Sequence, residues 1–223
     1  MIVDTKQIIL LLDELSSVIK GHVDLYMIGG GAMMFLGSKQ FTKDLDLVAC
    51  NENDYRDVSE ALSSIGFTSD MPTCGMDKVD LQDTLTRGEY RIDLFDRVIC
   101  GSLLLSETMK ARSVSRYESG SINLYSCGAE DIFLLKSVTE REGDIADCNS
   151  LIRSSTKFDW NALISEIRGQ MAIGNPVWIT YVMERLDIMD FKSRRSDVYN
   201  LVKELEGNYL EEWADRYENS HEL

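Results

Sequence analysis

The fold is decided by residues 25–47, which read LYMIGGGAMMFLGSKQFTKDLDL. A short apolar run meets three glycines at positions 29–31, and good helix formers follow as far as Gly37. Residues 44–47 then read DLDL, so that acids alternate with leucines. Alternation with a period of two is typical of a strand. The segment therefore predicts a strand, a glycine turn, a helix and a second strand.

The second of these strands carries two acids on one face. Asp44 and Asp46 are two residues apart, so their carboxylates project from the same side, while Leu45 and Leu47 enter the core from the other. Like charges at this spacing repel each other, and a folded protein tolerates them well when a divalent cation lies between them. Magnesium, a hard cation, prefers carboxylate oxygens. We therefore interpret this pair as part of a metal site.

A third acid lies on a later strand. Residues 90–95 read YRIDLF, so that Ile92 and Leu94 face one way and Asp93 faces the other. Three carboxylates on adjacent strands can hold two magnesium ions about 3.5 to 4 Å apart. One ion lowers the pKa of an attacking hydroxyl, and the other neutralises the charge of a leaving pyrophosphate. We predict Asp44, Asp46 and Asp93 as catalytic and metal-binding residues, with Asp93 as general base or as ligand of the metal on the nucleophile side.

The glycines predict a phosphate-binding turn. A glycine-rich turn at a helix N-terminus lets backbone N–H groups approach phosphate oxygens closely, and the helix dipole favours negative charge there. No Gly-Lys-Ser or Gly-Lys-Thr follows, so the turn is not a Walker loop, and the spacing is not that of a dinucleotide fingerprint. We predict Gly29, Gly30 and Gly31 as nucleotide-binding residues.

The rest of the chain predicts an α+β protein with two domains. Residues 1–128 should form a mixed β-sheet flanked by helices, and residues 129–223 should form a C-terminal helical bundle. Further strands are expected at residues 76–81, 90–95, 113–117 and 121–125, the last two as a hairpin. Helices are expected at residues 4–20, 53–65, 103–109, 129–140, 144–152, 160–171, 176–186 and 197–205.

The composition argues against several classes of protein. Among 223 residues, 38 acidic and 23 basic side chains give a formal net charge of -15, which repels nucleic acids and anionic membranes unless a local basic patch overrides it. No apolar stretch approaches the roughly 18 to 20 residues that span a bilayer, and the opening residues do not resemble a signal peptide. The five cysteines form no CxxC pair, and we interpret them as reduced thiols of a cytoplasmic protein.

These features together resemble the polymerase-beta-like nucleotidyltransferases. The likeness lies in Gly29-Gly30, the following helix, the TKDLDL segment at residues 42–47 and the later strand with Asp93. The small microbial branch, with antibiotic nucleotidyltransferases and the nucleotidyltransferase toxins of toxin–antitoxin pairs, is the most similar. Residues 129–136 and 141–147 resemble the first C-terminal helix of that branch. The resemblance implies the nucleotidyltransferase fold, a nucleoside triphosphate as substrate, two Mg²⁺ ions and contact of Lys136 with the triphosphate.

Three interpretations follow. The first is magnesium-dependent transfer of a nucleoside monophosphate to a hydroxyl acceptor, with release of pyrophosphate. The second is a catalytically weak nucleotide-binding or toxin–antitoxin interaction module of the same fold, because Gln40 stands where many relatives have arginine and Gly143 replaces a frequent lysine. The third is a metal-dependent phosphohydrolase. The acceptor (small molecule, tRNA or protein), the preferred base, an antitoxin partner and a homodimer are left open.

Overall fold

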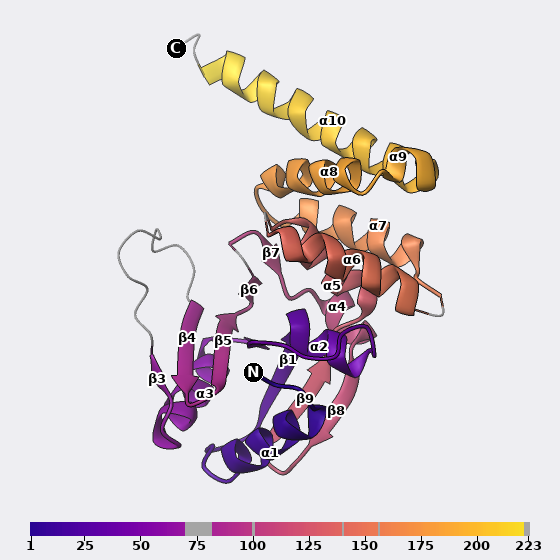
Figure 1. Cartoon of the computed structure of the whole chain (residues 1–223). Helices are drawn as coiled ribbons and strands as arrows, with labels where there is room; N and C mark the ends of the chain where they lie inside the picture. Colours follow the sequence, from indigo (N-terminus) through magenta and orange to yellow (C-terminus); the bar gives the residue numbers. More distant parts are fainter. Residues whose placement is uncertain (70–81, 100, 140, 156, 221–223) are drawn as a thin grey trace.

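A seven-stranded mixed sheet forms the N-terminal part of the chain, and a stack of helices forms the C-terminal part (Figure 1). The computed structural model describes residues 1–69, 82–99, 101–139, 141–155 and 157–220. The strand order is β3-β4-β5-β2-β1-β9-β8. The expected mixed sheet flanked by helices and followed by a helical region is therefore confirmed.

The centre of the sheet is built from β1 (Val23–Ile28), β2 (Leu45–Ala49) and β5 (Tyr90–Asp96). Strand β2 pairs antiparallel with β1 and parallel with β5. Leu45 and Leu47 are buried, because the alternation seen in the sequence turns them into the core. The predicted strands around residues 44–47 and 90–95 are both confirmed.

The outer strands extend the sheet on both sides. They are β3 (Thr68–Ser69), β4 (Gln82–Arg87), β8 (Val114–Glu118) and β9 (Ile122–Ser126). Strands β8 and β9 form the expected antiparallel hairpin, and β9 joins β1 in parallel. The strand expected at residues 76–81 lies outside the described residues.

One expected helix, at residues 103–109, is wrong in its first half. Strand β7 (Leu103–Leu104) pairs with β6 (Val98–Ile99) in a separate ribbon, and helix α4 (Glu107–Arg112) starts only afterwards. The start is set by Ser106, whose hydroxyl accepts the backbone N–H of Met109 as an N-cap. Leu103 and Leu105, which precede it, are buried in the core without belonging to a helix.

Three further helices belong to the N-terminal part. They are α1 (Thr5–Ser16), α2 (Gly29–Phe35) and α3 (Glu52–Ser64). Helix α1 is shorter than the expected 4–20 and starts at a capping box of Asp4 and Gln7. Helix α2 packs on β1 and β2, whereas α3 packs on β2 and β5.

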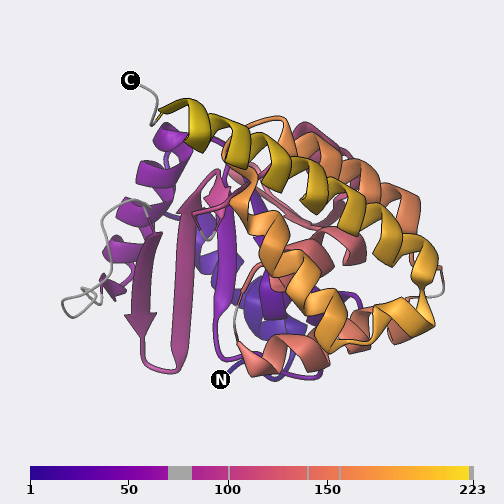
Figure 2. The same cartoon turned by 90° about the horizontal axis from the view of Figure 1, so that it is seen from above.

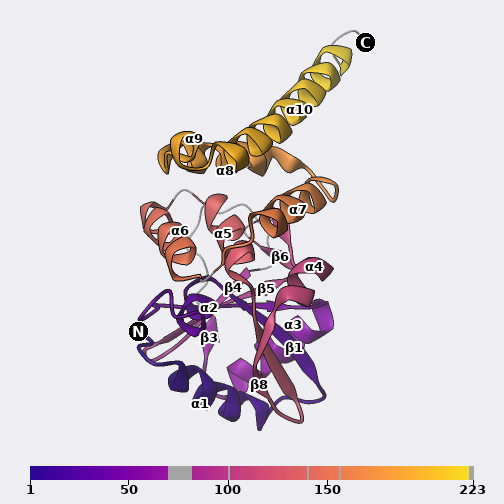
Figure 3. The same ribbon diagram turned by 90° about the vertical axis from the view of Figure 1, so that its right-hand side faces the viewer.

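The described C-terminal part is helical, as expected. Its elements are α5 (Ala129–Ser137), α6 (Glu142–Ser154), α7 (Trp160–Met171), η1 (Pro176–Trp178), α8 (Ile179–Ile188), α9 (Phe191–Arg194) and α10 (Ser196–Ser220). Figures 1 and 3 show α10 continuing past the other helices toward the C-terminus, and Figure 2 shows it crossing over them. Among the described residues, no helix has both the length and the apolar character needed to cross a membrane.

Helix α10 is much longer than the segment 197–205 that periodicity predicts, and α9 was not expected. Val202 and Tyr209 are buried, whereas Leu210 and Trp213 are exposed, so no apolar stripe continues along the described side chains after Tyr209. Helix α9 is a single short turn that follows Asp190, a residue in the left-handed conformation. Such a turn is too short to show helical periodicity.

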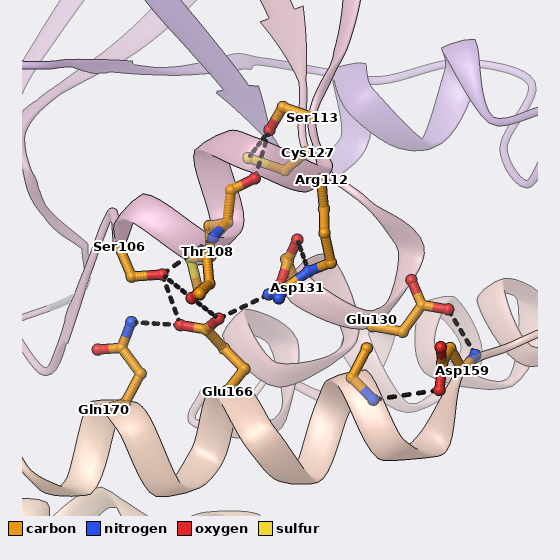
Figure 4. Close-up of polar contacts among 12 residues, drawn as sticks. Ser106, Thr108, Arg112, Ser113, Cys127, Glu130, Asp131, Asp159, Glu166 and Gln170 are labelled. Carbon is orange, nitrogen blue, oxygen red and sulfur yellow. Dashed lines mark hydrogen bonds and ion pairs between the residues drawn. The ribbon is translucent and has the colours of Figure 1, made fainter.

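A buried polar cluster joins α4 to the helices that follow (Figure 4). Arg112 binds Asp131 on α5 and, through Nη2 at 2.6 Å, Glu166 Oε2 on α7. The side chains of Asp131 and Glu166 are 0% and 2% exposed, whereas Arg112 is 27% exposed. Burial would raise the pKa of Glu166, but hydrogen bonds from Thr108, Ser106, Arg112 and Gln170 lower it. The arginine thus neutralises two carboxylates that have little contact with water.

One hydrophobic core includes residues from both parts of the chain. Ile132, Phe133 and Leu134 on α5 are fully buried, because this helix packs against both α2 and the helices after it. Helix α5 starts directly after Gly128, where we expected the second domain to begin. The division into residues 1–128 and 129–223 stays a prediction.

Replacing Arg112 with methionine should destabilise the fold by about 3 to 5 kcal/mol, because Asp131 and Glu166 would be left buried without a cation. The free energy of unfolding, measured by urea denaturation, tests this. Arg56→Met removes an exposed ion pair with Glu52 and should cost less than about 1 kcal/mol. Equal effects of the two substitutions would show that the Arg112 cluster does not stabilise the packing of α4 on α5 and α7.

Candidate carboxylate and lysine site

The pairing of β2 with β5 brings two of the predicted acids together. Asp46 is the direct register partner of Asp93, and Asp44 lies two residues before Asp46, just ahead of the strand. The pKa of Asp46 is raised to about 7, mainly by burial and further by the charges of Asp44 and Asp93. The three acids therefore lie within electrostatic reach of one another.

Asp93 is the most rigidly held of these acids. It is 3% exposed, and its Oδ1 accepts a hydrogen bond from Thr84 Oγ1 at 2.8 Å and one from Arg91 Nε at 3.3 Å. Thr84 is the register partner of Asp93 across β4 and β5. Sequence reasoning missed Thr84, because its role depends on strand pairing and not on any motif.

The three glycines let a helix approach this site more closely than any side chain would allow. Gly29 has a φ of +59°, and a Cβ there would lie 2.0 Å from Asp46 Oδ2. A Cβ on Gly30 would lie 2.2 Å from Thr42 Oγ1, and one on Gly31 would meet Met27 Sδ at 2.8 Å. Packing therefore explains why each position needs glycine, and contact with phosphate stays a prediction.

The glycine turn that we expected ahead of the helix is part of the helix itself. Helix α2 starts at Gly29, and Ile28 precedes it as an N-cap without a side-chain hydrogen bond. The glycines are needed in this first helical turn because it packs closely against β2 and the residues just before it, and side chains would leave no room for that packing.

Lys136 lies on α5 beside the acids. Its Nζ is 2.5 Å from Asp144 Oδ1 and 2.8 Å from Asp147 Oδ2, both on α6. Burial would lower the pKa of Lys136, but these two carboxylates raise it, so the lysine is charged. Its charge, with that of Arg141, lowers the pKa of Asp46 and partly opposes the effect of the neighbouring acids.

A second lysine, which the sequence did not assign to the nucleotide site, joins this group. Lys39 Nζ lies 2.7 Å from Asp147 Oδ2, the same oxygen that binds Lys136. The pKa of Asp147 is lowered, because hydrogen bonds from the two lysines outweigh its burial. Lys39 is far along the chain from Lys136 and Asp147, so only the tertiary fold reveals that it meets them.

The donor set fits a hard cation in its chemistry. Asp44 and Asp46 are half-buried carboxylates whose like charges accumulate beside buried Asp93. Within the described ranges, however, no three His, Cys, Asp or Glu side chains already have the geometry to hold a metal. The carboxylates repel one another, and a cation between them would have to draw them together.

No family model and no curated protein sequence matches the chain, but solved structures are similar to it. One is the lincosamide antibiotic adenylyltransferase LnuA with lincomycin bound, at 15% identity over 70% of this chain and 100% of that chain, with a TM-score of 0.46. Another is ANT(2")-Ia in complex with adenylyl-2"-tobramycin, at 10% identity over 74% and 98%, with a TM-score of 0.47. Likeness at this level does not assign an activity, so the chemistry has to be inferred from the residues of this chain.

Asp46→Asn should stabilise the metal-free protein increasingly as the pH rises. The pKa of Asp46 in the folded protein is about 7, above its ordinary value of 3.8. The unfolded chain therefore releases the proton of Asp46 at a lower pH than the folded chain does. As a result, the free energy of unfolding of the wild type falls as the pH rises from 3.8 to about 7. The asparagine variant does not titrate there. Thermal unfolding in a chelator should show the gain in Tm growing to on the order of 5 °C by about pH 7 and then levelling off. A gain independent of pH would contradict the raised pKa.

Proposed function

We propose that this chain is a magnesium-dependent nucleotidyltransferase that moves a nucleoside monophosphate from a nucleoside triphosphate to a hydroxyl acceptor. The observation that carries the proposal is the β2–β5 register, in which Asp46 faces Asp93 while Asp44 and Lys136 lie within electrostatic reach. A cluster of acids beside a charged lysine suits a substrate that brings both metal cations and phosphate anions.

Asp44, Asp46 and Asp93 would hold the metal. When bound, magnesium neutralises charge on the phosphates and lowers the pKa of a coordinated hydroxyl. Asp46 has the strongest need for a cation, because its carboxylate is desolvated and faces two like charges. Asp93, oriented by Thr84, is suited to act as general base or as the ligand on the acceptor side.

The proposed reaction is an in-line displacement at the α-phosphorus. The acceptor oxygen forms a bond to phosphorus, and the bond to the bridging oxygen of the β-phosphate breaks with its electron pair. The hydroxyl proton passes to the base, for which Asp93 is the candidate. Lys136 would bind the triphosphate, and the main chain of Gly29, Gly30 and Gly31 would lie against it.

A catalytically weak nucleotide-binding module is the second candidate. It is favoured by the two carboxylates that already bind Lys136, since a phosphate would have to share or displace them. An antitoxin partner or a second copy of the chain would fit this alternative. We keep the cytoplasm as the proposed location, and the acceptor is a small molecule, a tRNA or a protein in either case.

Replacing both Asp44 and Asp46 with asparagine should abolish metal-dependent nucleotide binding and turnover. The physical reason is the loss of two carboxylate ligands, which should lower the rate of pyrophosphate release by a factor on the order of 10³ or more. Calorimetry with Mg²⁺ and each nucleoside triphosphate measures binding, and pyrophosphate release across an acceptor screen measures turnover. Asp57→Asn, at an exposed position of α3, is the control.

Two outcomes would decide between the candidates. Binding that is lost in the double variant, together with pyrophosphate release by the wild type, supports the transferase. Binding by the wild type without any pyrophosphate release supports the weak module. Free phosphate as the product would instead indicate a phosphohydrolase using the same acids, and retained activity in the double variant would exclude this site.

Thr84→Val should lower kcat about 10- to 100-fold with little change in KM, because Asp93 would lose the hydroxyl that orients its carboxylate. Thr86→Val is the matched control, since Thr86 lies on the same strand and pairs with Arg91 instead. Steady-state kinetics of both variants tests this. Equal losses in the two variants would mean that β4 contributes only stability.

A further inference from the structure

Two lysines from distant parts of the chain share one carboxylate oxygen. Lys39 Nζ lies 2.7 Å from Asp147 Oδ2, and Lys136 Nζ lies 2.8 Å from the same atom. Lys136 also binds Asp144, so two carboxylates balance the two ammonium groups, and the packing holds two sets of N–H donors close together. Such a pair suits a ligand with more than one negative charge.

This pair of lysines lies next to the candidate site. A Cβ on Gly30 would lie 3.9 Å from Lys39 Cδ, so the stem of Lys39 runs beside the first turn of α2. The same turn contacts Asp46 through Gly29. Lys136 in turn acts electrostatically on Asp46. Both ammonium groups therefore lie on the flank of the carboxylates where helices α2, α5 and α6 meet.

The two lysines differ in their access to solvent. The side chain of Lys39 is 29% exposed, against 13% for Lys136 and 15% for Asp147. An ammonium group has three N–H donors. Among the described residues, Lys39 donates to Asp147, whereas Lys136 donates to both Asp144 and Asp147. Lys39 is therefore the better placed of the two to donate to an incoming anion.

We propose that Lys39 is a second triphosphate-binding residue, which binds the β- and γ-phosphates together with Lys136 while Asp147 positions both lysines. This inference rests on the proposed function, since it concerns the substrate of the same site. A leaving pyrophosphate carries more negative charge than one ammonium group neutralises. Lys39 supplies the additional positive charge, at the more exposed side of the pair.

A purely structural role for Lys39 makes a different prediction. The segment between α2 and β2 is also attached to α6 by Ser150 Oγ, which donates to the carbonyl of Ser38 at 2.6 Å. If Lys39 merely anchors this segment, then removing Ser150 should have a similar effect. Ser150→Ala is therefore the matched control, because it removes an attachment of the same segment without removing a charge.

The test compares Lys39→Gln, Lys39→Arg and Ser150→Ala by calorimetry in the presence of Mg²⁺ and without acceptor. The ligands are the nucleoside triphosphate that the wild type binds best and the corresponding monophosphate. Lys39→Gln should weaken binding of the triphosphate by about tenfold or more, since it loses a charge-assisted hydrogen bond. Binding of the monophosphate should change by less than about twofold, because that ligand lacks the β- and γ-phosphates. Lys39→Arg and Ser150→Ala should bind both ligands nearly as the wild type does.

Other results would overturn the inference. Unchanged triphosphate binding in Lys39→Gln, while the wild type binds, excludes Lys39 and leaves the proposed function standing. Equal weakening of both ligands in Lys39→Gln and Ser150→Ala assigns Lys39 to the anchoring of its segment. No triphosphate binding by the wild type overturns the proposed function itself, and the inference with it.

Discussion

The candidate site depends on the close approach of a helix backbone to the carboxylate of Asp46. Any side chain at residue 29 would begin 2.0 Å from Asp46 Oδ2, and the backbone there adopts a positive φ that favours glycine. This contact joins the end of β1, the start of α2 and the start of β2 at one point. That packing contributes to the burial of Asp46, and the register of β2 with β5 then places Asp93 beside it.

Charge organises the surroundings of this contact. Acids gather on the strands, and Lys136 on α5 opposes their charge. Lys39, in the segment after α2, meets Lys136 through Asp147. The lysines are in turn held by Asp144 and Asp147 on α6, so the site depends on the helical part as well as on the sheet. The buried cluster around Arg112 connects α4 to α5 and α7, so it helps to fix the positions of these three helices relative to one another (Figure 4).

Local patterns in the sequence predicted most elements but not their limits. Alternation at residues 44–47 and 90–95 identified the central strands β2 and β5, and helical periodicity identified α7 with its bounds. The helix expected at residues 103–109 failed because Leu103 and Leu104 pair with a neighbouring strand, a choice that periodicity over so few residues does not reveal. Helix α10 exceeded its predicted length because the described side chains after Tyr209 form no apolar stripe.

The sequence by itself determined that acids would share a strand face, that glycines would precede them, and that a third acid would lie on another strand. These features are local, since the period of a strand alone fixes the side on which a residue projects. Only the tertiary structure decided that Asp93 faces Asp46, that Thr84 holds Asp93, and that Lys39 meets Lys136 through Asp147. Strand register and helix packing bring together residues that are distant in the chain, and no local pattern contains that information.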